Sequence, residues 1–248
     1  MNYAVVTICL NAEETLQRTI DSVLVQNPSP AEFLFIDGGS DDGTLAIIEK
    51  TRERLPDGTR LELVRQPPTP TGIAGIPNAW NLALERVTAD LVFLLNADDW
   101  CEPTTAATVL QAFTDKPATD LLITPIRFAT GPDDPAPGIL SPRPFWLFPV
   151  LMPVMHPGCF VRRTVYERVG CFDERYRISA DYDFVYRCRK AGMHFVHCNC
   201  PLVTMQKGGL ANRSRALARD ESLRIALAHS RVPLLSRLAH LARRILGR

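Results

Sequence analysis

The chain has 248 residues, of which 46% are hydrophobic and 22% are charged, as is typical of a globular protein with one large α/β domain. Lys and Arg total 28 and Asp and Glu total 27, so the net charge of +1 does not favour nucleic acid as the main partner. The seven scattered cysteines indicate reduced, packed thiols, and no leader-like or bilayer-spanning apolar run is present. We therefore expect a cytoplasmic protein.

The first part of the chain alternates short apolar runs with amphipathic stretches. Residues 3–10, 32–36 and 61–64 are predicted strands, and the stretches after the first two carry the apolar spacing of helices. This alternation predicts an α/β fold with a parallel sheet. Asn11 is expected to cap the first helix. No Gly-x-Gly-x-x-Gly follows the first strand, which disfavours a dinucleotide-binding Rossmann domain.

A buried strand is predicted at residues 91–95, and it runs directly into Asn96, Asp98 and Asp99. Carboxylates at such a position are costly unless something compensates them, and ligands of open α/β sheets bind at the carboxyl ends of strands. The pattern favours a site for Mg²⁺ or Mn²⁺, which prefer oxygen ligands, beside a diphosphate. A polar turn that merely ends the strand is the alternative interpretation.

The second part of the chain mixes helices and strands around a proline-rich segment. Residues 130–157 contain eight prolines, so we predict an irregular lid, binding loop or covering flap there. A helix is predicted at 181–190, and two more are predicted after 212, broken near Pro233. The last of them, at 234–246, has one apolar and one basic face. Such a helix packs on a core or a second subunit, or lies on an anionic membrane surface.

Four short motifs occur in order along the chain. They are Val-Val-Thr-Ile-Cys-Leu-Asn at 5–11, Asp-Gly-Gly-Ser-Asp-Asp-Gly-Thr at 37–44, Asn-Ala-Asp-Asp at 96–99 and Ser-Ala-Asp-Tyr-Asp at 179–183. Over residues 1–210 the sequence resembles the family-two inverting nucleotide-sugar glycosyltransferases of the GT-A fold. The resemblance implies a single, mostly parallel mixed sheet with helices on both faces. Its nucleotide-binding half would be residues 1–100 and its acceptor half 101–210, followed by a C-terminal helical extension at 211–248.

The resemblance also implies roles for individual residues. Five of them would lie against the nucleotide: Thr7, Asn11, Asp37, Asn78 and Asn96. Asp98 and Asp99 would hold Mn²⁺ or Mg²⁺, Asp181 would be the catalytic base, and His156 would lie on the acceptor side. The residues by themselves also allow simpler roles, with Asp181 as a helix cap, Asp37 in a turn, Asp183 in a surface pair with Arg187, and His156 as a loop histidine.

The sequence departs from the family pattern at two site positions. Asn96 stands where many members have the first Asp of Asp-x-Asp, and Asn78 stands where close relatives often carry Asp. These changes leave the base and the sugar of the donor open. They also motivate an alternative hypothesis, a nucleotide-sugar-binding subunit that supports a partner enzyme without turnover.

The leading hypothesis is an inverting, metal-dependent glycosyltransferase of cell-surface polysaccharide biosynthesis. It would transfer a sugar from a UDP-, GDP- or dTDP-linked donor to a hydroxyl of a glycan or lipid-linked acceptor. A nucleotidyltransferase is disfavoured, because the stretch after the first strand is acidic where a Gly- and Arg-rich phosphate loop would be needed. The basic C-terminal helix is expected to contact the inner face of the membrane peripherally or to form a homodimer.

Overall fold

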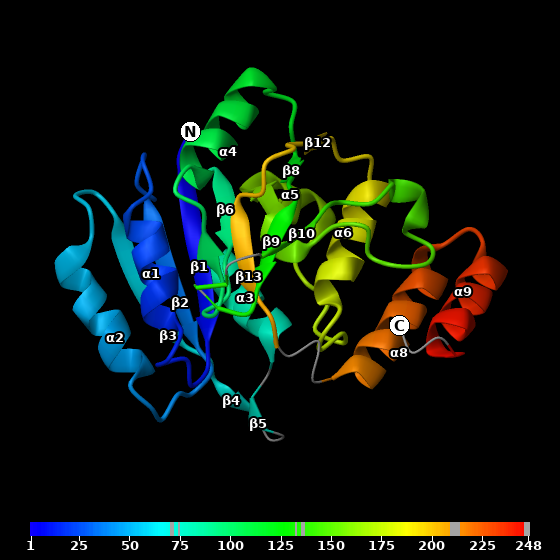
Figure 1. The fold of residues 1–248 in the computed structure, drawn as a ribbon, viewed down its shortest axis with the longest axis horizontal. Helices are drawn as coiled ribbons and strands as arrows, with labels where there is room; N and C mark the ends of the chain where they lie inside the picture. Colours follow the sequence, from blue (N-terminus) through cyan, green and yellow to red (C-terminus); the bar gives the residue numbers. More distant parts are fainter. Residues whose placement is uncertain (70–71, 74, 132, 135–136, 209–213, 246–248) are drawn as a thin grey trace.

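A seven-stranded sheet forms the centre of the molecule, in the order β12-β8-β11-β6-β1-β2-β3 (Figure 1). The computed structural model describes residues 1–248 except 70–71, 74, 132, 135–136, 209–213 and 246–248. The strands of this sheet are β1 Tyr3–Cys9, β2 Glu32–Asp37, β3 Arg60–Arg65, β6 Leu91–Leu94, β8 Leu121–Ile123, β11 Cys159–Arg162 and β12 Phe195–His197. The predicted mostly parallel α/β architecture is confirmed.

Strand directions decide which residues meet. Strands β6, β1, β2 and β3 run parallel, whereas β11 lies antiparallel between β6 and β8. The carboxyl ends of the four parallel strands therefore share one edge of the sheet with the beginning of β11. We call this edge the site edge, because Asn11, Asp37 and the 96–99 motif lie at or just after the ends of these strands, and His156 precedes β11.

A second, four-stranded sheet lies beside the first, in the order β10-β9-β13-β7. Its strands are β7 Trp100–Cys101, β9 Ile126–Ala129, β10 Gly138–Leu140 and β13 Val203–Gln206, and a small ribbon is formed by β4 Pro68–Thr69 and β5 Gly72–Ile73. The resemblance implies a single sheet, so this second sheet is an addition to the expected fold. The chain turns after β6, so that Trp100 and Cys101 pair with β13 and leave the main sheet.

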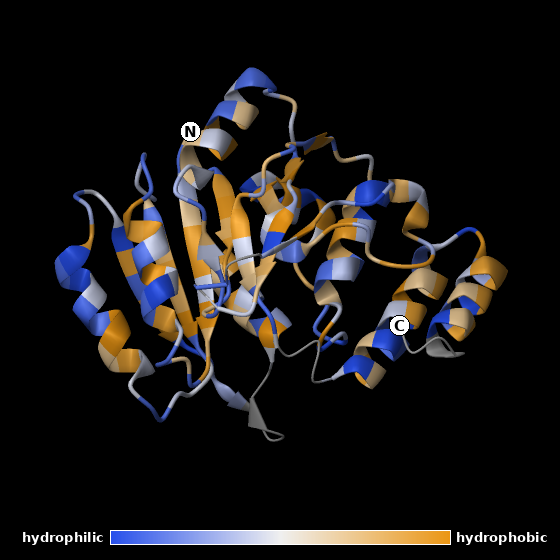
Figure 2. Ribbon diagram, viewed as in Figure 1, coloured by the Kyte–Doolittle hydropathy of each residue, from blue (hydrophilic) through white to orange (hydrophobic). Residues whose placement is uncertain are grey.

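Helices cover both faces of the main sheet. One face is covered by α1 Leu16–Leu24, α2 Thr44–Thr51 and α4 Thr105–Asp115, and the other by α3 Ile76–Leu84, α5 Arg163–Val169 and α6 Ala180–Lys190. Alternate residues of β1 serve the two cores, with Tyr3 and Val5 on the first face and Ala4 and Val6 on the second. The central strands β1 and β6 are accordingly mostly hydrophobic, whereas the edge strand β3 and the helices mix hydrophobic and hydrophilic residues (Figure 2). Three short 3₁₀ helices are η1 Arg52–Arg54, η2 Phe145–Leu147 and η3 His156–Gly158.

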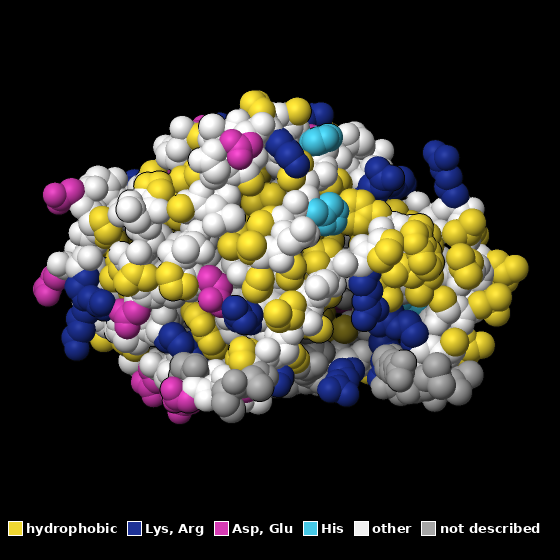
Figure 3. Space-filling view, turned by 45° about the horizontal axis from the view of Figure 1, so that its top comes forward, with side chains coloured by type: hydrophobic (Ala, Val, Ile, Leu, Met, Phe, Trp, Pro, Cys, Tyr) yellow, Lys and Arg dark blue, Asp and Glu magenta, His cyan; other side chains and the backbone are white. Residues whose placement is uncertain are grey.

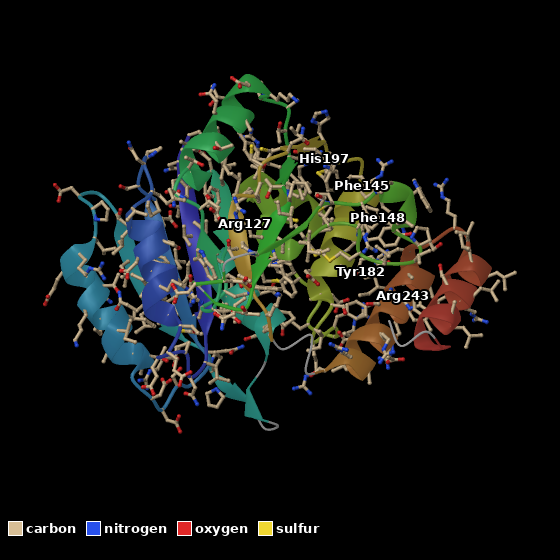
Figure 4. The ribbon with its side chains drawn as sticks, viewed as in Figure 1. Arg127, Phe145, Phe148, Tyr182, His197 and Arg243 are labelled. Atoms are coloured by element: carbon tan, nitrogen blue, oxygen red, sulfur yellow. The ribbon has the colours of Figure 1, made fainter. Side chains whose placement is uncertain are left out.

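The proline-rich segment is largely irregular, as predicted, and part of it covers the core. Phe148 is buried, and Phe145 packs on it and on Phe195. The Tyr182 hydroxyl of α6 donates a hydrogen bond to the backbone oxygen of Phe148, and Figure 4 shows these side chains together. The neighbouring Trp146 remains exposed.

The predicted pair of C-terminal helices is confirmed, with α8 at Arg215–His229 and α9 at Pro233–Ile245 (Figure 1). The first is bonded to the loop before α6. The buried Glu221 carboxylate accepts hydrogen bonds from the backbone N–H groups of Arg177 (2.7 Å), Ile178 (2.9 Å) and Ser179 (2.9 Å). Helix α8 therefore holds the backbone that leads into the Asp181 motif.

A second contact joins α8 to α6. His229 Nε2 lies 2.7 Å from one oxygen of Asp183, and Arg187 Nε donates to the other at 2.7 Å. Burial opposes ionisation of Asp183, but the bonds from His229 and Arg187 outweigh it and lower its pKa. The expected pair between Asp183 and Arg187 is confirmed, but it is not a surface pair, because α8 covers the Asp183 side chain and leaves it 3% exposed.

The Glu221 contact predicts a stability effect. Glu221→Ala leaves three backbone N–H groups without their acceptor, so the free energy of unfolding should fall by about 3 kcal/mol. Urea unfolding followed by circular dichroism measures the change. The matched control is Asp220→Ala at the preceding, half-exposed position of α8, where the change should stay within about 0.5 kcal/mol. Equal effects of the two substitutions would contradict the anchoring role.

Candidate active site

Asp37 is the last residue of β2 and is fully buried at the site edge. Its carboxylate accepts hydrogen bonds from the backbone N–H groups of Gly39 (3.0 Å) and Ser40 (3.1 Å). Gly39 has a φ of 100°, a conformation that favours glycine. Asp37 thus shapes the turn that follows β2, and its contact with a nucleotide stays a prediction.

Asn11 ties the loop after β1 to the loop after β2. Its N–H donates to Ser40 Oγ at 2.9 Å, and its Oδ1 accepts from the Asp41 N–H at 3.0 Å. The expectation that Asn11 caps the first helix is wrong, because α1 begins only at Leu16 and Asn11 has a left-handed φ of 49°. Asn tolerates that conformation better than most residues.

Thr7 lies in the middle of β1 and has no exposed surface. Its Oγ1 is buried and has no hydrogen-bond partner among the described residues. Its direct contact with a nucleotide stays a prediction.

Asn78, in the first turn of α3, bridges the two halves of the molecule. Its Oδ1 accepts a hydrogen bond from Gln66 Nε2 at 2.9 Å, and its Nδ2 donates to the Glu174 carboxylate at 3.2 Å. Gln66 follows β3 at the site edge, and Glu174 comes from the predicted acceptor half. Neither partner was predicted from the sequence. Gln66 lies two residues beyond the predicted strand at 61–64 and directly follows β3 only because the observed strand extends to Arg65.

Asn96, Asp98 and Asp99 form an acidic corner after β6. Asp99 is buried, and its oxygens accept hydrogen bonds from the Gln206 N–H (3.0 Å) and from Asn96 Nδ2 (3.3 Å). Burial, followed by the negative charge of Asp98, raises the pKa of Asp99 well above its usual range. Two adjacent carboxylates in this setting repel each other, and a cation would relieve that repulsion.

Arg18 of α1 lies beside the acidic corner. Its Nη2 donates to the backbone oxygen of Asp98 at 3.0 Å and to Gln206 Oε1, and its guanidinium lies 4.0 Å from the centre of the Trp100 ring. Burial lowers the pKa of Arg18, and the charges of Asp98 and Asp99 oppose that shift. No sequence motif indicates this residue, because it is brought to the corner from a distant helix.

The acidic corner offers oxygen donors that fit a hard divalent cation. Asn96 Oδ1 is buried without a hydrogen-bond partner in the described part of the chain, and Asp98 is partly exposed. Asp99 is 1% exposed, so the partly exposed Asp98 is the carboxylate that a ligand can reach more easily. No group of three His, Cys, Asp or Glu suited to a metal occurs among the described residues, so further ligands would have to come from phosphate or water, as is usual for Mg²⁺.

Asp181 is the second residue of α6, and its Oδ1 accepts a hydrogen bond from the Tyr182 N–H at 2.8 Å. Burial raises the pKa of Asp181 to about 6, and the charge of Glu221 adds to the shift. The residues on either side of Asp181, Ala180 and Tyr182, belong to the same buried cluster as Cys159, the first residue of β11. A carboxylate with a pKa near the working pH suits a general base.

His156 lies in η3, directly before β11, and its ring stacks on Trp80 with 4.5 Å between ring centres. Burial lowers its pKa to about 4, so the imidazole is neutral at physiological pH. The η3 turn contacts both β6 and β13. A Cβ at Gly158 would lie 2.6 Å from the Thr124 backbone oxygen, so only glycine fits this close packing.

The predicted residues converge on the site edge from both halves of the chain. The acidic corner follows β6, and the His156 turn contacts β6 and precedes β11. The neighbours of Asp181 in α6 share a buried cluster with Cys159 at the start of β11. Asn11, Asp37 and Asn78 gather at the ends of β1, β2 and β3. The arrangement brings a candidate cation site and a candidate base to one edge of the sheet.

Comparisons with known proteins place the chain in a family. The model of the family "Glycosyl transferase family 2" matches residues 4–170. A PGL/p-HBAD biosynthesis glycosyltransferase of Mycobacterium bovis is 26% identical over 192 residues, which cover 75% of this chain and 69% of the relative. An uncharacterized glycosyltransferase of Mycobacterium tuberculosis is 29% identical over 196 residues, which cover 74% of this chain and 67% of the relative.

Solved structures share the fold at low sequence identity. TarS from S. aureus in complex with UDP-GlcNAc aligns with a TM-score of 0.68 and 17% identity, covering 97% of this chain and 70% of that one. This chain spans only 41% of a longer TarS structure. The mannosyltransferase PcManGT from Pyrobaculum calidifontis, in complex with GDP-Man and Mn²⁺, aligns with a TM-score of 0.68 and 16% identity over 92% of this chain and 63% of its own. The chain is a glycosyltransferase that belongs to glycosyl transferase family 2 and has the GT-A fold.

Proposed function

We propose that this protein is an inverting, metal-dependent glycosyltransferase that moves a sugar from a nucleotide-diphosphate sugar to a hydroxyl of a glycan or lipid-linked acceptor. The observation that carries the proposal is Asp181, a carboxylate whose pKa is raised to about 6 beside the site edge that holds the acidic corner. Cell-surface polysaccharide biosynthesis is the proposed context. The cysteines of the described chain are free thiols, which fits a cytoplasmic location.

Asp181 would act as the general base. As the acceptor hydroxyl attacks the anomeric carbon, Asp181 takes its proton, and the bond to the diphosphate breaks on the opposite face of the sugar. Attack from that face inverts the anomeric configuration. The neutral His156 can orient the acceptor by hydrogen bonding without competing for the proton.

Asp98 and Asn96 Oδ1 are the groups that would hold Mn²⁺ or Mg²⁺ at the acidic corner. When bound, such an ion offsets the negative charge that develops on the departing diphosphate. The donor is proposed to be a UDP-, GDP- or dTDP-sugar. Solved structures of TarS with UDP or UDP-GlcNAc and of PcManGT with GDP-Man and Mn²⁺ support this class of donor.

A nucleotide-sugar-binding subunit without turnover is the second candidate, favoured by Asn78 and Asn96 at positions that are often acidic in relatives. Release of nucleotide from UDP-, GDP- and dTDP-sugars in the presence of Mn²⁺ separates the candidates. A pure binding subunit releases none.

Replacing the proposed base should separate activity from stability. Asp181→Asn should lower kcat for sugar transfer by about 100- to 10,000-fold, because the proton acceptor is lost. Asp181 has a higher pKa in the folded state, about 6, than in the unfolded chain. The free energy of unfolding therefore falls as the pH rises through this pKa, and ionised Asp181 destabilises the folded state above it. The variant should therefore have a higher Tm than the wild type at about pH 7.5. Unchanged transfer by the variant would remove Asp181 from the role.

The same group predicts the pH dependence of the reaction. Only ionised Asp181 can accept a proton, so kcat/KM should rise with pH through a midpoint near the pKa of about 6. Initial rates at saturating metal across the acid to neutral range measure the midpoint. The Glu221→Gln variant should move it downward, since Glu221 contributes to the raised pKa. A profile that is flat over this range would contradict the assignment.

The acidic corner predicts metal-dependent donor binding. Asp98→Ala should abolish the Mn²⁺-dependent part of the Tm increase that a nucleotide-sugar causes, since a ligand that binds only the folded state raises its stability. Asp115→Ala, at the exposed end of α4, is the matched control and should keep the full increase. If Asp98→Ala still shows a full Mn²⁺-dependent increase, the corner does not hold the ion.

A further inference from the structure

Helix α9 turns its polar face toward the protein and its apolar face away from it. Ser236 and His240 are 0% and 8% exposed, whereas Leu234, Leu238 and Leu241 are 69%, 56% and 54% exposed. These leucines lie on the side of the helix opposite Ser236 and His240, given about 100° of rotation per residue. An ordinary surface helix does the reverse, because burying the leucines is what stabilises it.

The orientation of α9 is fixed by contacts along its inner face. The helix packs on α8, and Arg243 Nη1 donates a hydrogen bond to the Val150 backbone oxygen at 3.1 Å. Arg243 points inward, toward the proline-rich segment that carries Phe145 and Phe148 (Figure 4). Trp146 of that segment is 74% exposed. The leucines of α9 therefore cannot turn inward without breaking these contacts.

The exposed apolar surface lies at one end of the molecule. In Figure 3 hydrophobic atoms gather at the right, with Lys and Arg side chains around them, and Asp and Glu appear only elsewhere in that view. No described helix has the length and apolar character needed to span a bilayer. A surface of this kind can rest on a bilayer without crossing it.

The charge of the C-terminal sequence narrows the choice of partner. Residues 222–248 contain six arginines and two histidines and no Asp or Glu. The segment that carries the exposed leucines of α9 therefore has charged side chains of positive sign only. These leucines are Leu234, Leu235, Leu238 and Leu241. Arg243 faces the protein and Arg224 is paired with Asp220, but Arg231 and Arg237 are exposed. These two complement an anionic surface, to which each nearby Arg contributes about 1 kcal/mol of attraction.

A second copy of the chain is the less suitable occupant. A two-fold interface sets the same surface against itself, so it would bring two segments of six arginines together with no acidic residue in either. Stable dimers also bury about 800 Å² per partner, a larger surface than one exposed helix face offers. A bilayer needs only that the leucines enter its interfacial layer while the arginines remain among the headgroups.

We propose that the outward face of α9 docks on an anionic lipid surface. Leu234, Leu238 and Leu241 would enter the boundary between headgroups and acyl chains, with the exposed Arg237 beside them at headgroup level. Trp146 supplies an interfacial aromatic anchor on the neighbouring segment. Because α8 joins α9 to α6, this contact would hold the acceptor half of the chain next to the bilayer. The proposal goes beyond the transfer reaction and does not depend on it.

The test is co-sedimentation of the full chain with lipid vesicles, without donor or metal. Phosphatidylcholine vesicles with about 30% phosphatidylglycerol should bind the protein, and pure phosphatidylcholine should bind it far less. Leu238→Glu and Leu241→Glu should each weaken binding at least about tenfold, the loss expected for one inserted leucine. Raising the salt to about 0.5 M should weaken binding by the wild type.

The matched control is Val25→Glu, which adds the same charge at a residue that is 66% exposed at the end of α1. It should bind vesicles like the wild type. Circular dichroism and Tm check that each variant folds, and Leu238→Ala replaces Leu238→Glu if the latter does not. The proposal is overturned if the wild type does not bind anionic vesicles, or if Val25→Glu weakens vesicle binding as much as Leu238→Glu does. It is also overturned if light scattering shows that the only effect of Leu238→Glu is to dissociate a dimer. Nucleotide release, measured separately without vesicles, tests the transfer reaction by itself.

Discussion

The buried Asp99 carboxylate holds together the place where the two sheets meet. It accepts the Gln206 N–H from β13 and the Asn96 amide from the end of β6, so one side chain fixes the second sheet against the first. Arg18 adds a contact from α1 to both Asp98 and Gln206. These contacts hold the backbone of residues 96–99 in one conformation, and they therefore fix the position of the partly exposed Asp98.

Two carboxyl groups at the site are costly to ionise because they are buried. Asp99 and Asp181 both have raised pKa values because burial penalises their charges, and the neighbouring acids Asp98 and Glu221 increase the penalty. Such groups weaken a fold unless other contacts compensate them. Part of the penalty is offset by hydrogen bonds from the Gln206 N–H and the Asn96 amide to Asp99 and from the Tyr182 N–H to Asp181.

The sequence was sufficient for the features that depend on local pattern. Apolar runs predicted the parallel strands, and the polar residues after them predicted which side chains would reach the site edge. The features that could not be predicted from the sequence depend on contacts between segments that are distant in the chain. Asn11 looks like a helix cap and instead binds the next loop, while Arg18 and Glu221 look like ordinary surface residues of amphipathic helices. The second sheet was missed because β7 has only two residues and owes its place to β13.

The bonds from Glu221 and His229 also bear on how this chain relates to longer members of its family. A recombination event that replaced everything after residue 213 would remove the acceptor for three amides before α6 and the imidazole partner of Asp183. Helix α8 is thus a structural part of the transferase domain. Helix α9 is joined to the same body by its packing on α8 and by the Arg243 bond to the Val150 backbone oxygen, while its outward face is apolar.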